Sequence, residues 1–575
     1  MIEVESSTSA LKPTESSKFI IDRGPFVPGS QIDVAEFDLD ENKIYDWPVV
    51  YILANDREAY VGQTTSAARR INQHGANVEK QDFETVNIIY HDEFNASVVT
   101  DYEHRLIGLM HADGRYRLTN KNDGMTESSY FSKAEYGAMF EDLWDEMRSM
   151  ELASRSIADI EESEVFKYSP YKSLTVDQKV GLDAILSAIR SGLEQGKPIV
   201  VEGMPGTGKT VLAIYLMKML KDDPQYRDLN IRIVEPVTSL RETLRKSLKG
   251  VDGFGRRDVI APTDLVKPEM GYSPEKDKSF DIVLVDEAHK LKKRTNLGTQ
   301  FGNYDRVTEE LGLQKGSTQM DWIISQAKLP VFFYDPLQSI GPSCLGMEAM
   351  RLALGARLDD PIRLETQMRV KAGRSYLEYI RAILDAKNPN PKTFDTYDLV
   401  LHEDFSEFVE SFEQDYERND LCRMVAGYAW EWVSNPKRCK DPKVCDIVID
   451  GIGLKWNRTY DNWVVKGAED PTIAHEVGCI HSTQGYDLSY AYVIIGDDLV
   501  FDSDAETITA DKSHYFDRNG KAKAGQEELN QYIKNIYYVL LTRGIFGTHI
   551  YAANPAMREY LSKYLPLRPT PTPRP

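Results

Sequence analysis

The hydrophobic and polar positions of the chain change their period several times along its 575 residues. Between about residues 47 and 123, short β-rich runs and amphipathic helical stretches predict a compact α/β module. Residues 126 to 167 are acidic and carry apolar side chains at helical spacing, which predicts a helical connector. From about residue 168 onward, strands rich in Val and Ile alternate with longer amphipathic helices, a pattern typical of parallel α/β layers.

The two ends of the chain lack such a pattern. Residues 1 to 45 are polar and acidic, and we expect an acidic leader that is disordered or draped over another domain. Residues 556 to 575 end in LPLRPTPTPRP and are expected to form a proline-rich extended tail. The organised part of the chain is therefore expected to begin near residue 46 and to end near residue 555.

Composition limits the class of protein. Hydrophobic residues make up 41% and charged residues 28% of the chain, which is ordinary for a globular protein. No stretch approaches roughly 18 consecutive apolar residues, and the N-terminus is acidic where a secretory signal needs positive charge, so a cytoplasmic protein without a membrane partner is expected. Five scattered cysteines fit a reducing compartment. The net charge of −21 disfavours a global attraction to nucleic acid, but a binding groove needs only local positive charge.

The strongest motif is a glycine-rich loop between an apolar strand and a helix, in PIVVEGMPGTGKTVLAIYL. Such a loop turns backbone N–H groups towards phosphates, and the helix N-terminus adds partial positive charge. Lys209 is expected to reach the β- and γ-phosphates of ATP, and Thr210 to hold Mg²⁺. A second apolar strand ends in Asp286, expected in the Mg²⁺ shell, and Glu287, expected to orient and deprotonate the attacking water. The glycines expected to bind nucleotide are Gly203, Gly206 and Gly208.

Further motifs follow one another in a family order, and with them residues 168 to 554 resemble the superfamily 1 helicases, in particular the Schlafen group-3-like helicase domain of bacterial proteins. The resemblance implies two tandem RecA-like P-loop domains, at residues 168–360 and 361–555, with ATP bound between them. It assigns the adenine side to Gln178 and γ-phosphate sensing to Gln338 in VFFYDPLQSI. Tyr334 replaces the glycine usual in that motif.

The later motifs of the same family resemble LETQMR, CIHSTQGYDLSYAYVII and NIYYVLLTRG. The resemblance places Gln367, Arg369, Gln484 and Arg543 at the nucleotide. Arg543 is the candidate arginine finger, because a guanidinium supplied from a second domain couples hydrolysis to closure of the cleft.

Two basic clusters follow strand ends, where open parallel sheets place their binding crevice. Basic runs are commonly solvated surface, but their position beside motor motifs in an acidic chain favours a track for DNA or RNA. The clusters are Arg241, Arg245, Lys246 and Lys249, and Lys290, Lys292, Lys293 and Arg294.

The N-terminal module contains a predicted hairpin in VVYILANDREAYVG, residues 49–62. A turn centred on Asn55 and Asp56 would place Tyr51 directly opposite Tyr60. A tyrosine pair alone is ordinarily core packing.

Charged side chains close to this hairpin change that interpretation. Arg70 and His74 lie one turn apart on the next predicted helix, and Glu103 lies at the edge of an apolar stripe, where an unpaired carboxylate is costly to bury. Together with the tyrosines these groups suit phosphodiester cleavage, in which the carboxylate holds a divalent ion, Arg70 clamps the phosphate, and a tyrosine or His74 manages the proton.

Residues 47 to 124 resemble the GIY-YIG nucleases. The resemblance rests on Tyr51, the Tyr60-Val61-Gly62 triplet, Arg70 and Glu103, and it adds Asn120 as the late asparagine. It implies a small α+β fold and a metal requirement met by Mg²⁺ or Mn²⁺. Val49-Val50 stands where the family has Gly-Ile, and the spacing between the two tyrosines is shorter than usual.

The sequence therefore predicts an α/β protein in which a GIY-YIG-like module at residues 46–125 and a connector at 126–167 precede the ATP-driven motor. A bacterial antiviral role is the biological hypothesis, by family analogy. Two alternatives stay open: an ATPase switch that senses nucleic acid through a non-cleaving front domain, and a DNA-repair helicase-nuclease. The sequence leaves the choice of DNA or RNA, the polarity and the oligomeric state open.

Overall fold

The computed structural model of the chain describes residues 19–32, 36–37, 41–120, 130–161, 163–171, 174–193, 196–339, 341–365, 370–418, 421–441, 443–459, 463–483, 486–521 and 524–568. These residues form two compact units, one from the N-terminus to Leu174 with residues 247–254, and one from Thr175 that takes in the rest. In the described part, no helix has both the length and the apolar character needed to cross a membrane.

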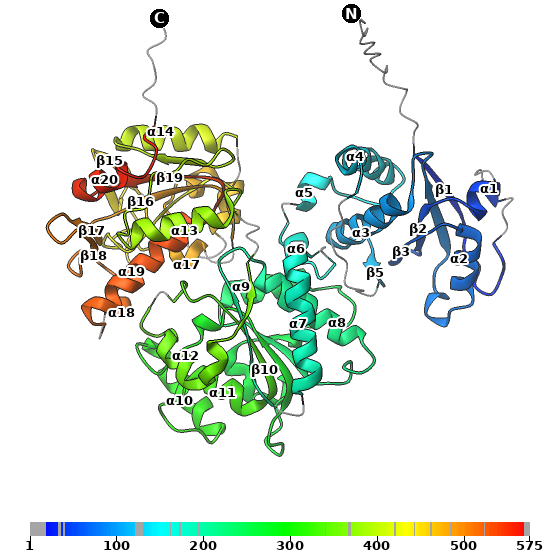
Figure 1. Cartoon of the computed structure of the whole chain (residues 1–575), viewed down its shortest axis with the longest axis horizontal. Coiled ribbons are helices and arrows are strands. Elements are labelled where there is room, and N and C mark those ends of the chain that lie inside the picture. Colours follow the sequence, from blue (N-terminus) through cyan, green and yellow to red (C-terminus); the bar gives the residue numbers. More distant parts are fainter. Residues whose placement is uncertain are drawn as a thin grey trace, which may run out of the picture. The chain divides into compact units, whose positions relative to one another are not determined.

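The N-terminal unit is built on a five-stranded sheet of order β1-β4-β2-β3-β5 (Figure 1). All neighbouring strands are antiparallel except β3 and β5, which are parallel. Helix α2 packs on one face, where Ala67, Ala68 and Ile71 share a core with Tyr51 and Leu53. The strands are β1 (Ile20–Pro25), β2 (Val49–Ala54), β3 (Glu58–Thr64), β4 (Thr85–Tyr90) and β5 (Arg117–Leu118), and the helices are α1 (Glu41–Tyr45), α2 (Ala67–Gly75) and α3 (Ala96–Asp113).

Strand β1 lies where the acidic leader was expected, and that expectation is wrong for these residues. The strand pairs with β4 from Ile20 opposite Tyr90 to Pro25 opposite Thr85. Its buried inward positions are Asp22 and Gly24, so the strand carries no hydrophobic alternation that a pattern search could detect.

The predicted connector is helical, and it belongs to the N-terminal unit. Its apolar stripe packs on α3: the Phe140 ring meets Tyr102 edge to face with centroids 4.9 Å apart, and the Tyr102 hydroxyl donates to the Tyr136 carbonyl at 2.7 Å. The helices are α4 (Lys133–Ser149), α5 (Ile157–Glu161) and α6 (Glu164–Lys167).

The second unit begins with a six-stranded parallel sheet of order β11-β6-β10-β9-β7-β8. Strand β11 lies beyond residue 360, where the sequence placed the end of this domain. The strands are β6 (Ile199–Gly203), β7 (Ile231–Val234), β8 (Val259–Ile260), β9 (Phe280–Val285), β10 (Ala327–Tyr334) and β11 (Ile362–Leu364). The helices are α7 (Val176–Gly192), α8 (Lys209–Asp222), α9 (Thr238–Ser247), α10 (Phe301–Glu310), α11 (Gln319–Gln326) and α12 (Met347–Leu354).

A second parallel sheet follows, with four strands in the order β12-β19-β16-β13, and two hairpins, β14–β15 and β17–β18, accompany it. The strands are β12 (Asp398–Leu401), β13 (Arg423–Ala426), β14 (Ile447–Ile449), β15 (Ile452–Leu454), β16 (Leu488–Ile495), β17 (Leu499–Asp502), β18 (Thr507–Ala510) and β19 (Gly544–Ala552). The helices are α13 (Gly373–Leu384), α14 (Phe405–Tyr416), α15 (Trp463–Glu469), α16 (Pro471–Ala474), α17 (Ile480–Thr483), α18 (Arg518–Lys521), α19 (Gln526–Leu541) and α20 (Pro555–Ser562).

Helix α20 replaces the first part of the expected proline-rich tail. Asn554 caps it by accepting from the Met557 N–H at 3.1 Å, and Pro555 occupies its first turn, where no backbone donor is needed. Met557, Tyr560 and Leu561 are buried in the core of the second sheet. Residues 569–575 lie outside the described residues.

Candidate functional site

The glycine-rich loop joins β6 to α8, as the sequence predicts, and forms the first part of a candidate nucleotide site. Gly206 and Gly208 have φ angles of 80° and 79°, in the left-handed region that glycine enters without steric cost. A Cβ on Gly203 would meet the Thr207 hydroxyl and lie about 3.2 Å from the Lys209 side chain. Glycine at the end of β6 therefore lets the loop close over the strand.

The Lys209 ammonium lies inside this loop and is 6% exposed. Its Nζ donates to the carbonyl oxygens of Gly203 at 2.7 Å and Met204 at 3.0 Å, and it lies 3.9 Å from Asp335 Oδ2. The loop thus holds its cation at the N-terminus of α8, where a phosphate group would also benefit from the free N–H groups of the first turn.

Gln178, in α7, forms a hydrogen bond to the loop. Its Oε1 accepts from the Thr175 N–H at 3.1 Å in a capping box, and its Nε2 donates to the Thr207 carbonyl at 3.1 Å. The residue assigned to the adenine side therefore contacts the loop itself.

The acidic pair follows β9 directly. Asp286 is fully buried, and its Oδ1 accepts from the Glu287 N–H at 3.0 Å. Burial, helped by the charge of Glu287, raises the pKa of Asp286, while a hydrogen bond from Thr210 acts in the opposite direction. Asp286 Oδ2 has no hydrogen-bond partner among the described residues.

These oxygen atoms fit a divalent cation. Mg²⁺ prefers oxygen ligands and is usually held by one or two carboxylates with water and substrate phosphate. Asp286 offers a buried carboxylate oxygen without a protein partner, and the Thr210 hydroxyl lies beside that carboxylate. The two residues predicted to hold Mg²⁺ therefore lie together.

Glu287 adopts a left-handed backbone, with φ of 47°, which is strained for a residue with a Cβ. Its Oε2 lies 2.8 Å from His289 Nε2. Burial acts to raise the pKa of Glu287, but the interaction with His289 and the charges of Lys209 and Lys290 together outweigh it, so the pKa lies below its usual range. Burial lowers the pKa of His289. The carboxylate is thus ionised, as a base must be.

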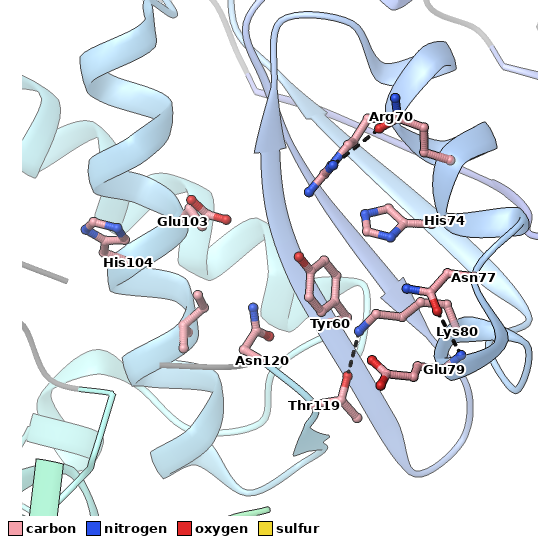
Figure 2. Close-up of a pocket in the computed structure, with 12 residues that line it drawn as sticks. Tyr60, Arg70, His74, Asn77, Glu79, Lys80, Glu103, His104, Thr119 and Asn120 are labelled. Carbon is pink, nitrogen blue, oxygen red and sulfur yellow. Dashed lines mark hydrogen bonds between the residues drawn. The ribbon is translucent and has the colours of Figure 1, made fainter. Parts of the chain in front are cut away.

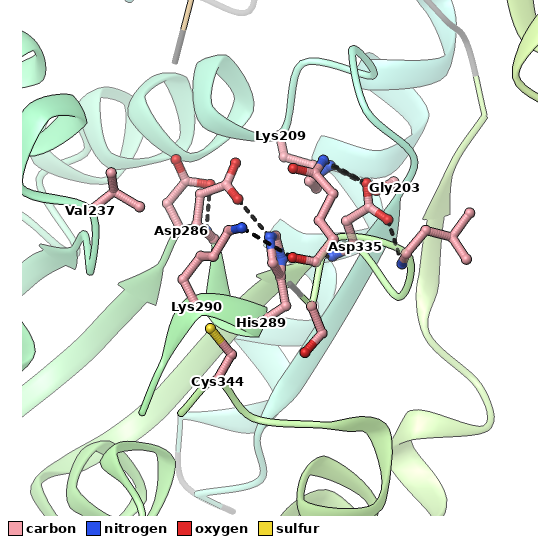
Figure 3. A network of polar contacts seen from close by, with 12 residues as sticks. Gly203, Lys209, Val237, Asp286, His289, Lys290, Asp335 and Cys344 are labelled. Carbon is pink, nitrogen blue, oxygen red and sulfur yellow. Dashed lines mark hydrogen bonds and ion pairs between the residues drawn. The ribbon is translucent and has the colours of Figure 1, made fainter. Parts of the chain in front are cut away.

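Asp335 joins the loop, the acidic pair and the sensor motif, as Figure 3 shows. Its N–H donates to His289 Nδ1 at 3.1 Å, and its Oδ2 accepts from Gln338 Nε2 at 2.8 Å. Lys290 Nζ donates to the Gln338 carbonyl at 3.0 Å. Sequence reasoning missed Asp335 and His289, although Asp335 follows β10 just as Asp286 follows β9.

The second sheet contributes Arg543, the candidate arginine finger. The residue is 4% exposed, and its guanidinium donates to the Tyr486 carbonyl at 3.2 Å. Its charge contributes to lowering the pKa of Lys290, after the larger effects of burial and the charge of Lys292. Helix α19 also reaches the sensor motif, where Asn535 Nδ2 donates to the Ser339 carbonyl at 2.9 Å. Gln367, Arg369 and Gln484 lie outside the described residues.

Several side chains of the two basic clusters bond to protein groups. Arg294 pairs with both carboxylate oxygens of Asp305 at 2.6 and 2.7 Å, and Lys290 is buried. Arg241 donates to the Glu235 carbonyl at 2.8 Å, whereas Lys246 is exposed. Protein contacts thus engage part of the two clusters, and the track for DNA or RNA stays a prediction.

The N-terminal hairpin has a different register from the one expected. Tyr51 lies opposite Gly62, and Tyr60 lies opposite Leu53, so the strands are shifted by two residues. The cause is a four-residue turn, Asn55–Glu58, in place of the expected tighter turn. A shift of two preserves the face, and the two tyrosine rings still lie 6.4 Å apart.

Gly62 makes room for Tyr51. A Cβ on Gly62 would overlap the hydroxyl and ring carbon of Tyr51, which lie over the strand at that point. The glycine of the Tyr60-Val61-Gly62 triplet thus has a packing reason in this chain, because any larger residue would displace the ring.

Tyr51, Arg70 and His74 form one polar group behind the hairpin. The Tyr51 hydroxyl lies 2.7 Å from His74 Nε2, and both residues are buried. Burial raises the pKa of Tyr51, and a hydrogen bond to Tyr51 raises that of Arg70. Burial, followed by the charges of Arg70 and Lys80, lowers the pKa of His74 to about 4. His74 is therefore neutral at neutral pH.

A pocket of about 340 Å³ opens beside this group (Figure 2). Glu103 of α3 lies across the pocket from Arg70 and His74 of α2. The residues predicted from the sequence that line it are Tyr60, Arg70, His74, Glu103 and Asn120.

Lys80 is a pocket residue that sequence reasoning missed. Its Nζ lies 3.5 Å from the centre of the Tyr60 ring and donates to Thr119 Oγ1 at 3.2 Å. A cation over an aromatic face stabilises both groups and adds positive charge beside the tyrosine. Nothing in the spacing of Lys80 indicated this, because a short 3₁₀ turn, Val78–Lys80, brings it over the ring.

Asn120 has a structural contact as well as a place in the pocket. Its Nδ2 donates to the Val61 carbonyl at 2.7 Å, and its Oδ1 accepts from the Val61 N–H at 3.1 Å. The amide therefore continues the pairing of β3 with β5 by mimicking a strand residue.

The protein groups of the pocket supply only some of the ligands that a divalent cation needs. Within the described ranges, no three His, Cys, Asp or Glu residues gather as a ready metal site. Glu103 and Glu79 line the pocket, so a divalent ion there would take a carboxylate oxygen, water and substrate phosphate.

Comparison with known proteins identifies the second unit. The family described as Schlafen group 3, DNA/RNA helicase domain, matches residues 197–554. An uncharacterized protein of Saccharomyces cerevisiae is 26% identical over 435 residues, which cover 68% of this chain and 90% of the yeast protein.

Two solved helicases are also similar to the chain. The Pif1 helicase from Candida albicans is 13% identical with a TM-score of 0.28, covering 68% of this chain and 99% of that chain. The helicase MrfA, crystallised bound to DNA, is 11% identical with a TM-score of 0.29, covering 69% of this chain and 55% of that chain.

Proposed function

Because the chain belongs to the Schlafen group 3 DNA/RNA helicase family, we propose that it is an ATP-driven nucleic-acid motor joined to a divalent-metal-dependent nuclease of the GIY-YIG type. The observation that carries the motor is the phosphate loop with Lys209 held beside Asp335, next to a buried Asp286 oxygen that lacks a protein partner in the described structure. The nuclease rests on the convergence of five predicted residues on one pocket.

The residues of the motor site divide the work of ATP hydrolysis. Lys209 binds the terminal phosphates, and Glu287 accepts the proton of the attacking water. His289 lies beside that base: its Nδ1 accepts from the Asp335 N–H, and its Nε2 lies 2.8 Å from Glu287 Oε2. Bound Mg²⁺ would be held by Asp286 and Thr210 and would neutralise phosphate charge.

The pocket residues suit phosphodiester hydrolysis. Arg70 binds the phosphate, and a tyrosine or neutral His74, whose Nε2 lies 2.7 Å from the Tyr51 hydroxyl, manages the proton. Glu103 is the carboxylate for Mg²⁺ or Mn²⁺, which when bound stabilises the developing negative charge.

The first experiment measures ATP hydrolysis by the full chain with single- and double-stranded DNA and RNA, together with cutting of the same labelled strands. Stimulated hydrolysis and Mg²⁺- or Mn²⁺-dependent cutting are expected. Stimulated hydrolysis without any cutting would favour the ATPase switch with a non-cleaving front domain. Directional unwinding of a tailed duplex would favour a repair helicase-nuclease.

The biological role that we propose is defence of a bacterial cell against foreign nucleic acid. The pairing of a cutting module with a motor supports it, because an ungated nuclease would endanger its own cell. Cells that express Lys209→Ala should lose protection in a phage challenge. Equal survival with the wild-type and the variant protein would contradict this role.

A further inference from the structure

Glu235 lies at the same edge of the parallel sheet as the acidic pair of the motor. Strands β7 and β9 are neighbours, with Val234 opposite Val285, so the next residues, Glu235 and Asp286, stand side by side. Main-chain bonds fix both positions: the Glu235 N–H donates to Ile260 O at 3.0 Å, and the Asp286 N–H donates to Val234 O at 3.0 Å. Paired positions of parallel strands direct their side chains to the same face.

Both carboxylates are fully buried, and each has one oxygen without a partner among the described residues. Glu235 Oε1 accepts from the Val237 N–H at 2.6 Å, which leaves Oε2 free. In Asp286, Oδ2 is the free atom. A buried carboxylate oxygen without a hydrogen bond is costly, and two of them on adjacent strands repel each other as well.

Arg241, on the helix that follows Glu235, does not resolve this cost. Arg241 directs its NH1 to the main-chain carbonyl of Glu235, at 2.8 Å. Arg241 thus leaves Glu235 Oε2 without a hydrogen bond among the described residues. The arrangement therefore calls for a cation from solution.

We propose that Glu235 is an additional oxygen donor of the divalent-cation site that Asp286 and Thr210 form, acting through its free Oε2. The proposal rests on the proposed ATPase function of this unit. It extends the site from the phosphate loop and the acidic pair to the end of a third strand, since Glu235 directly follows β7, the neighbour of β9. A second carboxylate strengthens binding of a divalent ion and favours it over a monovalent one.

The test is the Mg²⁺ dependence of nucleotide binding, measured with fluorescent methylanthraniloyl-ADP on the full-length protein. Glu235→Gln preserves the size of the side chain and an acceptor for the Val237 N–H. It should raise the Mg²⁺ concentration needed for half-maximal tightening by about 10-fold or more, as removal of a supporting ligand commonly does. Binding in EDTA should stay the same.

Three further variants provide controls for this result. Glu242→Gln, on α9, where the partly exposed Glu242 pairs with Arg245, changes the same charge outside the site and should behave like the wild type. Asp286→Asn should lose the Mg²⁺ response. Glu235→Asp retains the charge with a shorter reach and should fall between the wild type and Glu235→Gln, which provides a second measurement if Glu235→Gln folds poorly.

The outcomes separate the two claims. A wild-type Mg²⁺ response in Glu235→Gln, with loss of the response in Asp286→Asn, would overturn the role of Glu235 and leave the motor intact. If the wild-type protein binds no nucleotide with or without Mg²⁺, the proposed ATPase function fails and the role of Glu235 fails with it.

Discussion

The motor site and the N-terminal pocket use similar side chains under opposite conditions. At the motor site, Lys209, Asp286 and Asp335 are nearly or fully buried, and most of their polar atoms bond to other protein groups. The pocket instead presents Tyr60 and Glu103 as partly exposed side chains around an open volume. In a buried network the polar groups bond to one another until a small, highly charged ligand takes over these bonds. An open pocket instead suits a long polymer, because only a short part of the polymer has to enter it.

The largest expected effect comes from substitutions in the motor site, which should stop ATP hydrolysis. Lys209→Ala removes the cation of the phosphate loop and should lower ATP turnover by about 10²- to 10³-fold or more. Glu287→Gln should bind ATP and fail to hydrolyse it, because it preserves the shape and removes the base. Steady-state hydrolysis and nucleotide binding are the measurements. Wild-type turnover in Glu287→Gln would exclude the assigned base.

The corresponding change in the pocket is Glu103→Ala. It should eliminate strand cutting while ATP hydrolysis continues, because the two sites belong to different units. Removing metal with EDTA should stop both activities, so only the point variant distinguishes them. The neighbouring Asp101→Ala, on the same helix, is the matched control and should cut normally. Undiminished cutting by Glu103→Ala would remove this residue from the metal site.

A smaller effect tests the packing behind the pocket. Gly62→Ala places a methyl group where the Tyr51 ring lies and should destabilise the N-terminal unit by about 1–3 kcal/mol. Gly137→Ala, inside α4, where a Cβ has space, should stabilise the same unit by about 0.5–1 kcal/mol. Denaturant unfolding of both variants measures the difference. Equal stabilities would mean that the ring moves aside at little cost.

The last prediction is a pH dependence of stability from His74, which changes the slope of a stability curve and leaves both activities in place. Its pKa falls from 6.5 to about 4 on folding, so the unfolded chain binds the extra proton between these values. Stability should therefore decrease as the pH falls from about 6.5 to about 4, by up to about 3 kcal/mol, and the loss should stop below that range. His74→Gln should flatten this part of the curve. An unchanged slope in the variant would assign the loss to other groups.

Local patterns predicted the phosphate loop well because strand, loop and helix are contiguous in the chain. Sequence reasoning missed Glu235 and Asp335. These residues reach the site only because their strands are neighbours of the strands that carry the known motifs, and local spacing in the sequence does not reveal the order of strands in a sheet. The hairpin register failed because the Asn55 side chain accepts two N–H groups and lengthens the turn. Strand β1 was missed because its inward positions are Asp22 and Gly24.

The left-handed backbone of Glu287 lowers the stability of the fold at a residue that the proposed ATP hydrolysis needs. A glycine at this position would relieve roughly 1–2 kcal/mol of conformational strain, and it would also delete the carboxylate. Laboratory evolution that selects only for heat resistance should therefore enrich Glu287→Gly and accumulate stable but inactive proteins. Screens for a more durable version of this motor need ATP turnover as a second selection from the first round.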